Sequence, residues 1–163
     1  MNDSHIDNLI KTFPDGTLII LCGPPGSGKS TYASHLQHCY YYPVVCPDDI
    51  RQELTGNASD QTHNTEVFDT VYKRLIYYLQ SNYSVIYDAT NCRPNYRTKI
   101  LSVVKDLAKK VVCIIFTTPI TECIKRNSER DRKVPDSVIE KMYLGLRNHP
   151  PTVYEGYNVI IRV

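Results

Sequence analysis

The stretch GPPGSGKS at residues 23–30 restricts the fold of this chain more than any other part of the sequence. It fits the pattern G-x-x-x-x-G-K-[ST] through Gly23, Gly28, Lys29 and Ser30. The apolar run TLIILC before it is typical of a buried parallel strand, and the segment that begins at Lys29 reads as a helix. Such a turn gathers backbone N–H groups around phosphate oxygens. The pattern therefore predicts a bound nucleoside triphosphate, with an ordinary glycine-rich turn as the alternative.

The residues of this turn and of the helix start are expected to bind the nucleotide: Gly23, Pro24, Pro25, Gly26, Ser27, Gly28, Lys29, Ser30 and Thr31. Lys29 would reach the β- and γ-phosphates, and the Ser30 hydroxyl would be a ligand of Mg²⁺. The expected cofactors are therefore ATP, as phosphoryl donor, and Mg²⁺. The motif leaves the acceptor open, since water, a small molecule, a protein or a polynucleotide would all suit it.

Strand-like and helix-like patterns alternate along the rest of the chain. The runs YPVVCP, YSVIYDATN, VVCIIFTT and YNVIIRV indicate strands. Between them, NTEVFDTVYKRLIYYLQ indicates a helix with one apolar face, formed by Val67, Val71, Leu75, Ile76 and Leu79. This order predicts an α/β fold with a mostly parallel central sheet, and ligands at the carboxyl ends of its strands. A chain of 163 residues suits one domain, residues 1–163.

Composition narrows the functional classes only a little. The net charge of +2 is too small to argue for a nucleic-acid or membrane partner by itself. The six cysteines show no paired metal spacing, which favours a reducing, cytoplasmic location. The N-terminus lacks the basic start and apolar run of a signal peptide, and no apolar stretch is long enough to span a membrane.

Two acidic residues and an arginine follow the second expected strand, in the stretch CPDDIRQ. Asp48 is placed to accept the proton of an attacking hydroxyl, and Arg51 is placed to grip a phosphate of the acceptor. The alternative is that Asp48 only caps a helix. At the exit of the next strand, YDATN supplies Asp88 and Asn91 as further acceptor-side candidates. Asp88 would hold a metal-bound water, and the alternative is a polar strand exit with a turn at Asn91.

The stretch IKRNSERDRKVP contains the densest group of basic residues in the chain. The stretch PITECIKRNSER reads as a helix, so Arg126 and Arg130, which are four residues apart, are expected on one helix face. Two guanidinium groups there could neutralise charge on a transferring phosphoryl group. The basic connector that follows is typical of a mobile lid, and the alternative is a solvated face of mixed charge.

Together, GPPGSGKST, DDIRQ, TECIKRNSER and VIEKMY followed by VYEG resemble the kinase domain of phage-type polynucleotide 5′-kinases, within the P-loop kinase superfamily. The resemblance covers Leu18 to about Gly156. It implies a three-layer P-loop kinase sandwich with an α-helical lid at about residues 122–135. It also implies transfer of the ATP γ-phosphate to the 5′-hydroxyl end of DNA or RNA.

By this resemblance, Asp48 is the general base, Arg51 contacts the phosphate beside the acceptor hydroxyl, and Arg126 and Arg130 act on the donor phosphates together with Lys29. The YDATN stretch and the lid connector depart from the phage pattern, and the chain ends before a phosphatase domain. A separate phosphatase or ligase is therefore an expected partner, and no membrane is. Two other functions stay open: a P-loop kinase of a nucleoside, nucleotide or sugar, and a nucleotide-binding regulatory module without transfer.

Overall fold

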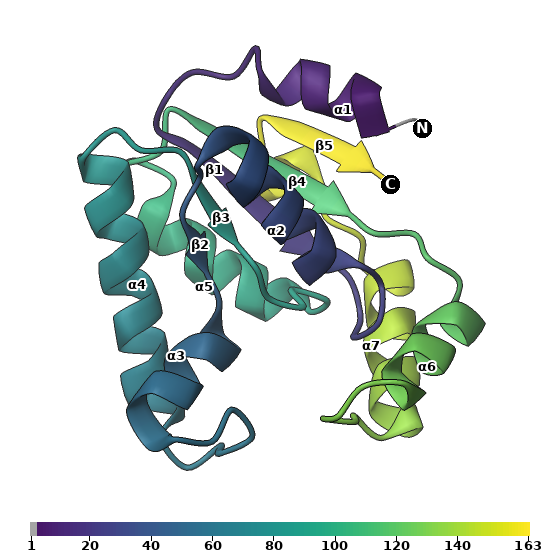
Figure 1. The fold of residues 1–163 in the computed structure, drawn as a ribbon. Helices are drawn as coiled ribbons and strands as arrows, with labels where there is room; N and C mark the ends of the chain where they lie inside the picture. The colour runs from purple at the N-terminus through teal and green to yellow at the C-terminus, as the bar shows by residue number, and fades with distance from the viewer. Residues whose placement is uncertain (1–2) are drawn as a thin grey trace.

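The computed structural model describes residues 3–163, which form a parallel sheet with helices on both faces (Figure 1). The strands are β1 (Thr17–Cys22), β2 (Val44–Val45), β3 (Val85–Tyr87), β4 (Lys110–Ile115) and β5 (Val159–Arg162). Their order across the sheet is β2-β3-β1-β4-β5, and all neighbouring pairs are parallel. The predicted α/β class with a parallel sheet is confirmed.

Helix α1 (Asp3–Ile10) precedes the first strand, and the helices that connect the strands are α2 (Lys29–Tyr40), α3 (Pro47–Thr55), α4 (Asn64–Gln80), α5 (Pro94–Val104), α6 (Ile120–Ser128), α7 (Asp136–Asn148) and the short 3₁₀ helix η1 (Val153–Glu155). In α4 the expected apolar face is buried except for Ile76, which is half-buried. No helix within residues 3–163 combines the length and apolar character that crossing a membrane requires.

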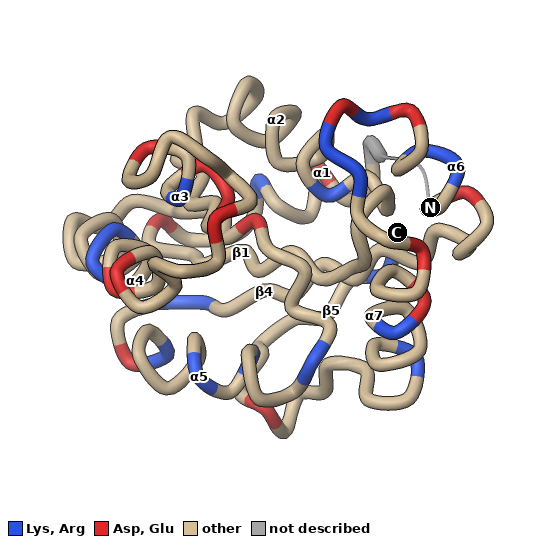
Figure 2. The backbone as a smooth tube through the Cα atoms, turned by 90° about the horizontal axis from the view of Figure 1, so that it is seen from below, with Lys and Arg blue, Asp and Glu red and all other residues tan. Residues whose placement is uncertain are grey.

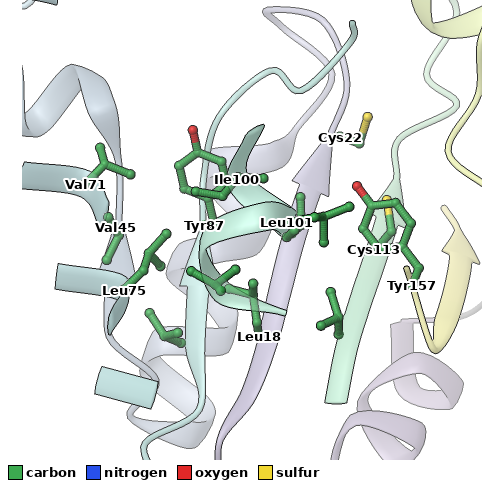
Figure 3. Close-up of a cluster of buried hydrophobic side chains, with 14 of the residues drawn as sticks. Leu18, Cys22, Val45, Val71, Leu75, Tyr87, Ile100, Leu101, Cys113 and Tyr157 are labelled. Atoms are coloured by element: carbon green, nitrogen blue, oxygen red, sulfur yellow. The ribbon is translucent and has the colours of Figure 1, made fainter. Parts of the chain in front are cut away.

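Two apolar layers enclose the sheet, because the strands of a parallel sheet are buried on both faces and their side chains alternate between them. One layer joins alternate residues of β1 to α4 and α5, with Leu18, Leu75 and Tyr87 among its members (Figure 3). The other joins the remaining residues of β1 to α1 and α2, as Ile19 and Leu36 illustrate. The result is the predicted three-layer arrangement.

The loops that follow β1, β3 and β4 meet at the carboxyl edge of the sheet. The Gly23 N–H donates to the Thr90 carbonyl at 2.9 Å, joining the first two loops. The Thr118 hydroxyl donates to the Ser27 carbonyl at 2.9 Å, joining the third. Because β1 lies centrally, with β3 and β4 on either side of it, its glycine-rich loop is the point toward which the other two converge.

Helix α6 is shorter than the sequence pattern predicts. The prediction of a continuous helix through Arg130 was wrong, since α6 ends at Ser128. The buried Asn127 side chain explains this: its amide donates to the Val134 carbonyl at 2.8 Å, and its carbonyl accepts from the Val134 N–H at 3.0 Å. These two bonds close residues 128–133 into a loop.

Candidate active site

The glycine-rich loop between β1 and α2, residues 23–28, is held by close packing against the lid helix α6. Gly26 has φ +80°, a backbone conformation that favours glycine, and an added Cβ would lie 2.2 Å from the Cys123 carbonyl oxygen. Gly28, with φ +99°, precedes the first residue of α2. The loop therefore needs glycine at Gly26 for space as well as for conformation, and it aims the amino end of α2 at its own concave side.

Lys29 is the first residue of α2 and is only 7% exposed. Its ammonium donates to the Pro24 carbonyl at 2.8 Å and lies 3.4 Å from the Ser27 hydroxyl. Burial lowers the pKa of Lys29, and the nearby Asp88 carboxylate opposes that shift. The side chain is thus held over the loop, which is the position expected of a phosphate-binding lysine.

Asp88, directly after β3, lies against the start of α2. It is 6% exposed, and burial raises its pKa, while a hydrogen bond from the Ser30 hydroxyl and the charge of Lys29 oppose the rise. A hydroxyl beside a carboxylate is an oxygen donor set that suits Mg²⁺. No group of three or more His, Cys, Asp or Glu residues within 3–163 is arranged to hold a metal by itself. The residues fit a Mg²⁺ bound through Ser30 and Asp88 and completed by phosphate oxygens and water.

Asp48 lies in the first turn of α3, with its carboxylate between two arginines. Oδ1 accepts from Arg51 Nη1 at 2.6 Å, and Oδ2 accepts from Arg132 Nη1 at 3.0 Å. Arg51 is 4% exposed and also donates to the Asn64 side-chain oxygen at 3.1 Å. Its Nε has no hydrogen-bond partner in the described part of the chain. The buried arginine therefore fixes one carboxylate oxygen, while an exposed one holds the other.

Two cavities meet at the glycine-rich loop. The main cleft, of about 1050 Å³, is lined by Gly28, Lys29, Ser30, Asp48, Arg51, Asp88, Asn91, Arg130 and Arg132, among others. The side hollow, of about 820 Å³, is lined by Gly26, Gly28, Thr31, Tyr32, His35, Phe116, Arg126, Arg130 and Val163. Among the predicted nucleotide-binding residues, Gly23, Pro24 and Ser27 line neither cavity. Gly26, Gly28 and Arg130 line both, so the phosphate loop is where the two cavities connect.

The two lid arginines occupy different places. Arg126 is on α6, where its Nε donates to Glu122 at 2.7 Å, and it lines the side hollow. Arg130 lies beyond the end of α6, in the loop that Asn127 closes. Figure 2 shows this loop as a run rich in Lys, Arg, Asp and Glu, and its Arg132 reaches Asp48 of α3 across the main cleft. Both arginines reach the neighbourhood of Gly28, although not by sharing a helix face.

Asn91 is held within the protein framework. It has φ +48°, and its side-chain amide donates to the Leu21 carbonyl at 2.8 Å, which joins the ends of β3 and β1. Its own carbonyl accepts from Arg97 Nη1 at 3.2 Å. Arg97 is fully buried and also pairs with Glu155 at 2.7 Å. An acceptor-binding role for Asn91 stays a prediction, and its visible contacts keep the loops in place.

Sequence reasoning did not single out Arg97, Asn127 or Arg132 for the site. Asn127 falls four residues after the apolar Cys123, on the buried side of α6, and this was the one available signal. Arg132 meets Asp48 across 84 residues of sequence, which no local pattern encodes.

Comparison with known proteins agrees with this geometry. Residues 18–148 match the model of a family described as an AAA domain. The chain belongs to this family. In fold it is a P-loop kinase domain, as its five-stranded parallel sheet and phosphate loop indicate.

Two relatives resemble this P-loop kinase domain in sequence, and the second of them also does so in fold. The L-seryl-tRNA(Sec) kinase of Methanococcus maripaludis is 28% identical over 131 residues, which is 77% of this chain and 51% of the relative. A chain of the Pnkp1/Rnl/Hen1 RNA repair complex is 28% identical, with a TM-score of 0.75 over 84% of this chain and 46% of that one. The P-loop kinase domain thus spans about half the length of both.

A gluconokinase from Sinorhizobium meliloti shares the fold. Its structure superposes with a TM-score of 0.59 at 18% identity, over 93% of this chain and 83% of the gluconokinase. At that identity the likeness concerns the architecture of the P-loop kinase domain.

Proposed function

We propose that this P-loop kinase domain transfers the γ-phosphoryl group of ATP to the 5′-hydroxyl end of a DNA or RNA strand. The observation that carries the proposal is the position of Asp48, whose carboxylate lines the same cleft as Lys29 and Ser30 and is braced by the buried Arg51. A carboxylate that only capped α3 would not need a buried arginine behind it, and no side-chain cap bond is formed at that helix start.

The triphosphate would lie along residues 23–31, with Lys29 at its β- and γ-phosphates and Arg130 above them. The donor nucleoside would enter the side hollow, beside Arg126. Ser30 and Asp88 would hold Mg²⁺, which would neutralise part of the phosphate charge. The exposed cations of the lid would close over the phosphates and keep water out.

The acceptor would enter the main cleft from the side of α3. Among residues 3–163, Asp48 Oδ2 is held by Arg132 alone, and the Arg132 side chain is 42% exposed. That oxygen then accepts the 5′-hydroxyl proton as the hydroxyl oxygen attacks the γ-phosphorus. A new O–P bond forms, the bond from the γ-phosphorus to the bridging oxygen breaks, and ADP leaves. Arg51 would pair with the phosphate 3′ to the reacting sugar.

Two relatives support a polynucleotide acceptor. One is a kinase named for L-seryl-tRNA(Sec), and the other belongs to an RNA repair complex, so the names of both connect them with RNA. By analogy with that complex we propose that a separate phosphatase or ligase acts on the same strand ends. A small-molecule acceptor is the rival, and the role of Arg51 separates the two, because a bare nucleoside or sugar offers no phosphate for it.

The test is an acceptor screen with γ-labelled ATP and Mg²⁺. The acceptors are a 5′-hydroxyl oligonucleotide, a nucleoside 3′-monophosphate, the bare nucleoside, gluconate and seryl-tRNA. We expect label on the oligonucleotide. Arg51→Ala should lower kcat/KM on every acceptor, because it removes the brace of Asp48, and by about 100-fold more on acceptors that carry a phosphate 3′ to the reacting sugar. Exclusive labelling of gluconate, the nucleoside or seryl-tRNA would refute the proposal, and so would an equal effect of Arg51→Ala on every acceptor.

A further inference from the structure

Four aromatic side chains line the main cleft: Tyr87 is buried on β3, and the other three come from helices α4 and α5. Phe68 and Tyr72 come from α4, and Tyr96 comes from the first turn of α5. The rings of Phe68 and Tyr72 have their centroids 6.4 Å apart with an angle of 38° between their planes. Phe68 and Tyr72 are half-buried, and Tyr96 is 51% exposed. A cleft wall with this much exposed aromatic surface has ring faces available to a flat ligand.

Two cations lie over these rings. The Lys99 ammonium is 5.8 Å from the centre of the Tyr72 ring, and the Arg93 guanidinium is 5.9 Å from the centre of the Tyr96 ring. Within residues 3–163 neither Arg93 nor Lys99 pairs with a carboxylate, although other arginines do. Their charge is thus available to an anion that runs along the aromatic wall.

Aromatic faces interleaved with unpaired cations are what single-stranded nucleic acids bind, since each base has a ring face and each linkage has a phosphate. The wall lies in the same cleft as Asp48 and Arg51, whereas the side hollow, where the donor nucleoside is proposed to bind, contains neither. A strand whose 5′-hydroxyl reached Asp48 would therefore continue along α4 and α5.

We infer that Phe68, Tyr72 and Tyr96 form a stacking platform for the first bases of the acceptor strand, with Arg93 and Lys99 beside its phosphates. This inference rests on the proposed function and adds to it the form of the substrate. The substrate is a single-stranded 5′ end, because the bases of a duplex are paired and stacked on each other and do not offer their faces. Stacking of this kind is tolerant of sequence and does not involve the ribose 2′-hydroxyl.

The experiment compares a 5′-hydroxyl tetranucleotide with the same strand made abasic at its first two positions, which keeps every phosphate and removes the stacking faces. Wild-type kcat/KM should favour the strand with bases by about 5- to 100-fold. Tyr96→Ala should bring this ratio close to one, because the loss falls on the strand that carries bases. Lys99→Ala should lower kcat/KM by the same factor for both strands, and it should make kcat/KM less dependent on salt concentration. Annealing the tetranucleotide sequence into a blunt duplex should lower kcat/KM as well.

The control is Tyr154→Ala, because Tyr154 is 97% exposed and lines neither cavity. It should keep the wild-type ratio. If Tyr96→Ala also keeps that ratio while the wild type labels oligonucleotides, the platform is refuted and the proposed function stands. If the wild type labels no strand of any kind, the proposed function fails and the platform fails with it.

Discussion

Replacing Gly26 by alanine tests how closely the phosphate loop and the lid helix are packed. The added Cβ would lie 2.2 Å from the Cys123 carbonyl oxygen and 3.0 Å from that residue's Cα, and these are backbone atoms that cannot swing aside. At φ +80°, an alanine also costs about 1–2 kcal/mol in conformation alone. Overpacking adds about 1–3 kcal/mol, so we expect the free energy of unfolding to fall by about 2–5 kcal/mol.

Gly56→Ala is the matched control. Gly56 has φ +72° but an added Cβ there has nothing within 4 Å, so it isolates the conformational part of the cost. The two variants should differ by about 1–3 kcal/mol in unfolding free energy, which corresponds to about 2–12 °C in Tm for a chain of this size.

Denaturant unfolding and thermal melting of both variants give this difference directly, and the ATP KM is measured alongside. If the clash is relieved by α6 moving away from the loop, Gly26→Ala loses less stability but its ATP KM rises, because Arg126 and Arg130 move with the lid. Equal unfolding free energies for the two variants together with an unchanged ATP KM would refute the packing account.

Three further predictions concern charged groups. Arg97→Met should lower the free energy of unfolding by about 3 kcal/mol, because it leaves Glu155 and two carbonyls without their donor; a loss below 1 kcal/mol in urea unfolding would contradict this. Burial raises the pKa of Asp88, so its ionisation makes the wild type lose stability as pH rises from about 4 through the folded-state pKa. Asp88→Asn should therefore have the higher free energy of unfolding at neutral pH, and the two proteins should have equal values near pH 4. The variant should also bind Mg²⁺–ATP more weakly. A stability advantage of Asp88→Asn that grew as the pH fell would contradict this prediction. Arg132→Ala should change stability by less than about 1 kcal/mol, since its pair with Asp48 is exposed, and should lower the acceptor KM by up to about fivefold; a higher KM would show that Arg132 binds the acceptor.

Local patterns were enough to predict the phosphate loop and the sheet. The loop is specified by glycines whose conformation is set within a few residues. Helix α4 is specified by the regular spacing of its apolar residues, which gives it one face that packs on the sheet. The position of Asp48 after β2 followed from parallel-sheet topology, which brings the strand ends to one edge. These features depend on short stretches of sequence or on general rules of connection.

The remaining features depend on contacts between distant segments. Arg97 is a basic residue on a helix, which favours a surface position, but its four polar contacts to Asn91, His149 and Glu155 bury it completely. The end of α6 is set by the bonds of Asn127 to Val134, and these compete with continued helix. The spacing of residues along the sequence does not reveal such competition. The prediction that Arg126 and Arg130 share one helix face was therefore wrong.

The aromatic wall was also beyond the reach of sequence reasoning. Phe68 and Tyr72 belong to α4 and Tyr96 belongs to α5, and nothing in either stretch indicates that the three rings face one cleft. The chain has 13 tyrosines, and this number does not indicate which of them line the cleft.

The most direct measurement of the central claim is label transfer from γ-labelled ATP to a 5′-hydroxyl oligonucleotide by wild type and by Asp48→Asn. The account predicts label at the 5′ end with wild type. It predicts a fall in kcat of about 10²- to 10⁴-fold with Asp48→Asn while the KM for ATP stays the same, because the carboxylate acts on the acceptor and not on the donor. Transfer by Asp48→Asn at the wild-type rate, or an absence of 5′ label with wild type, would contradict it.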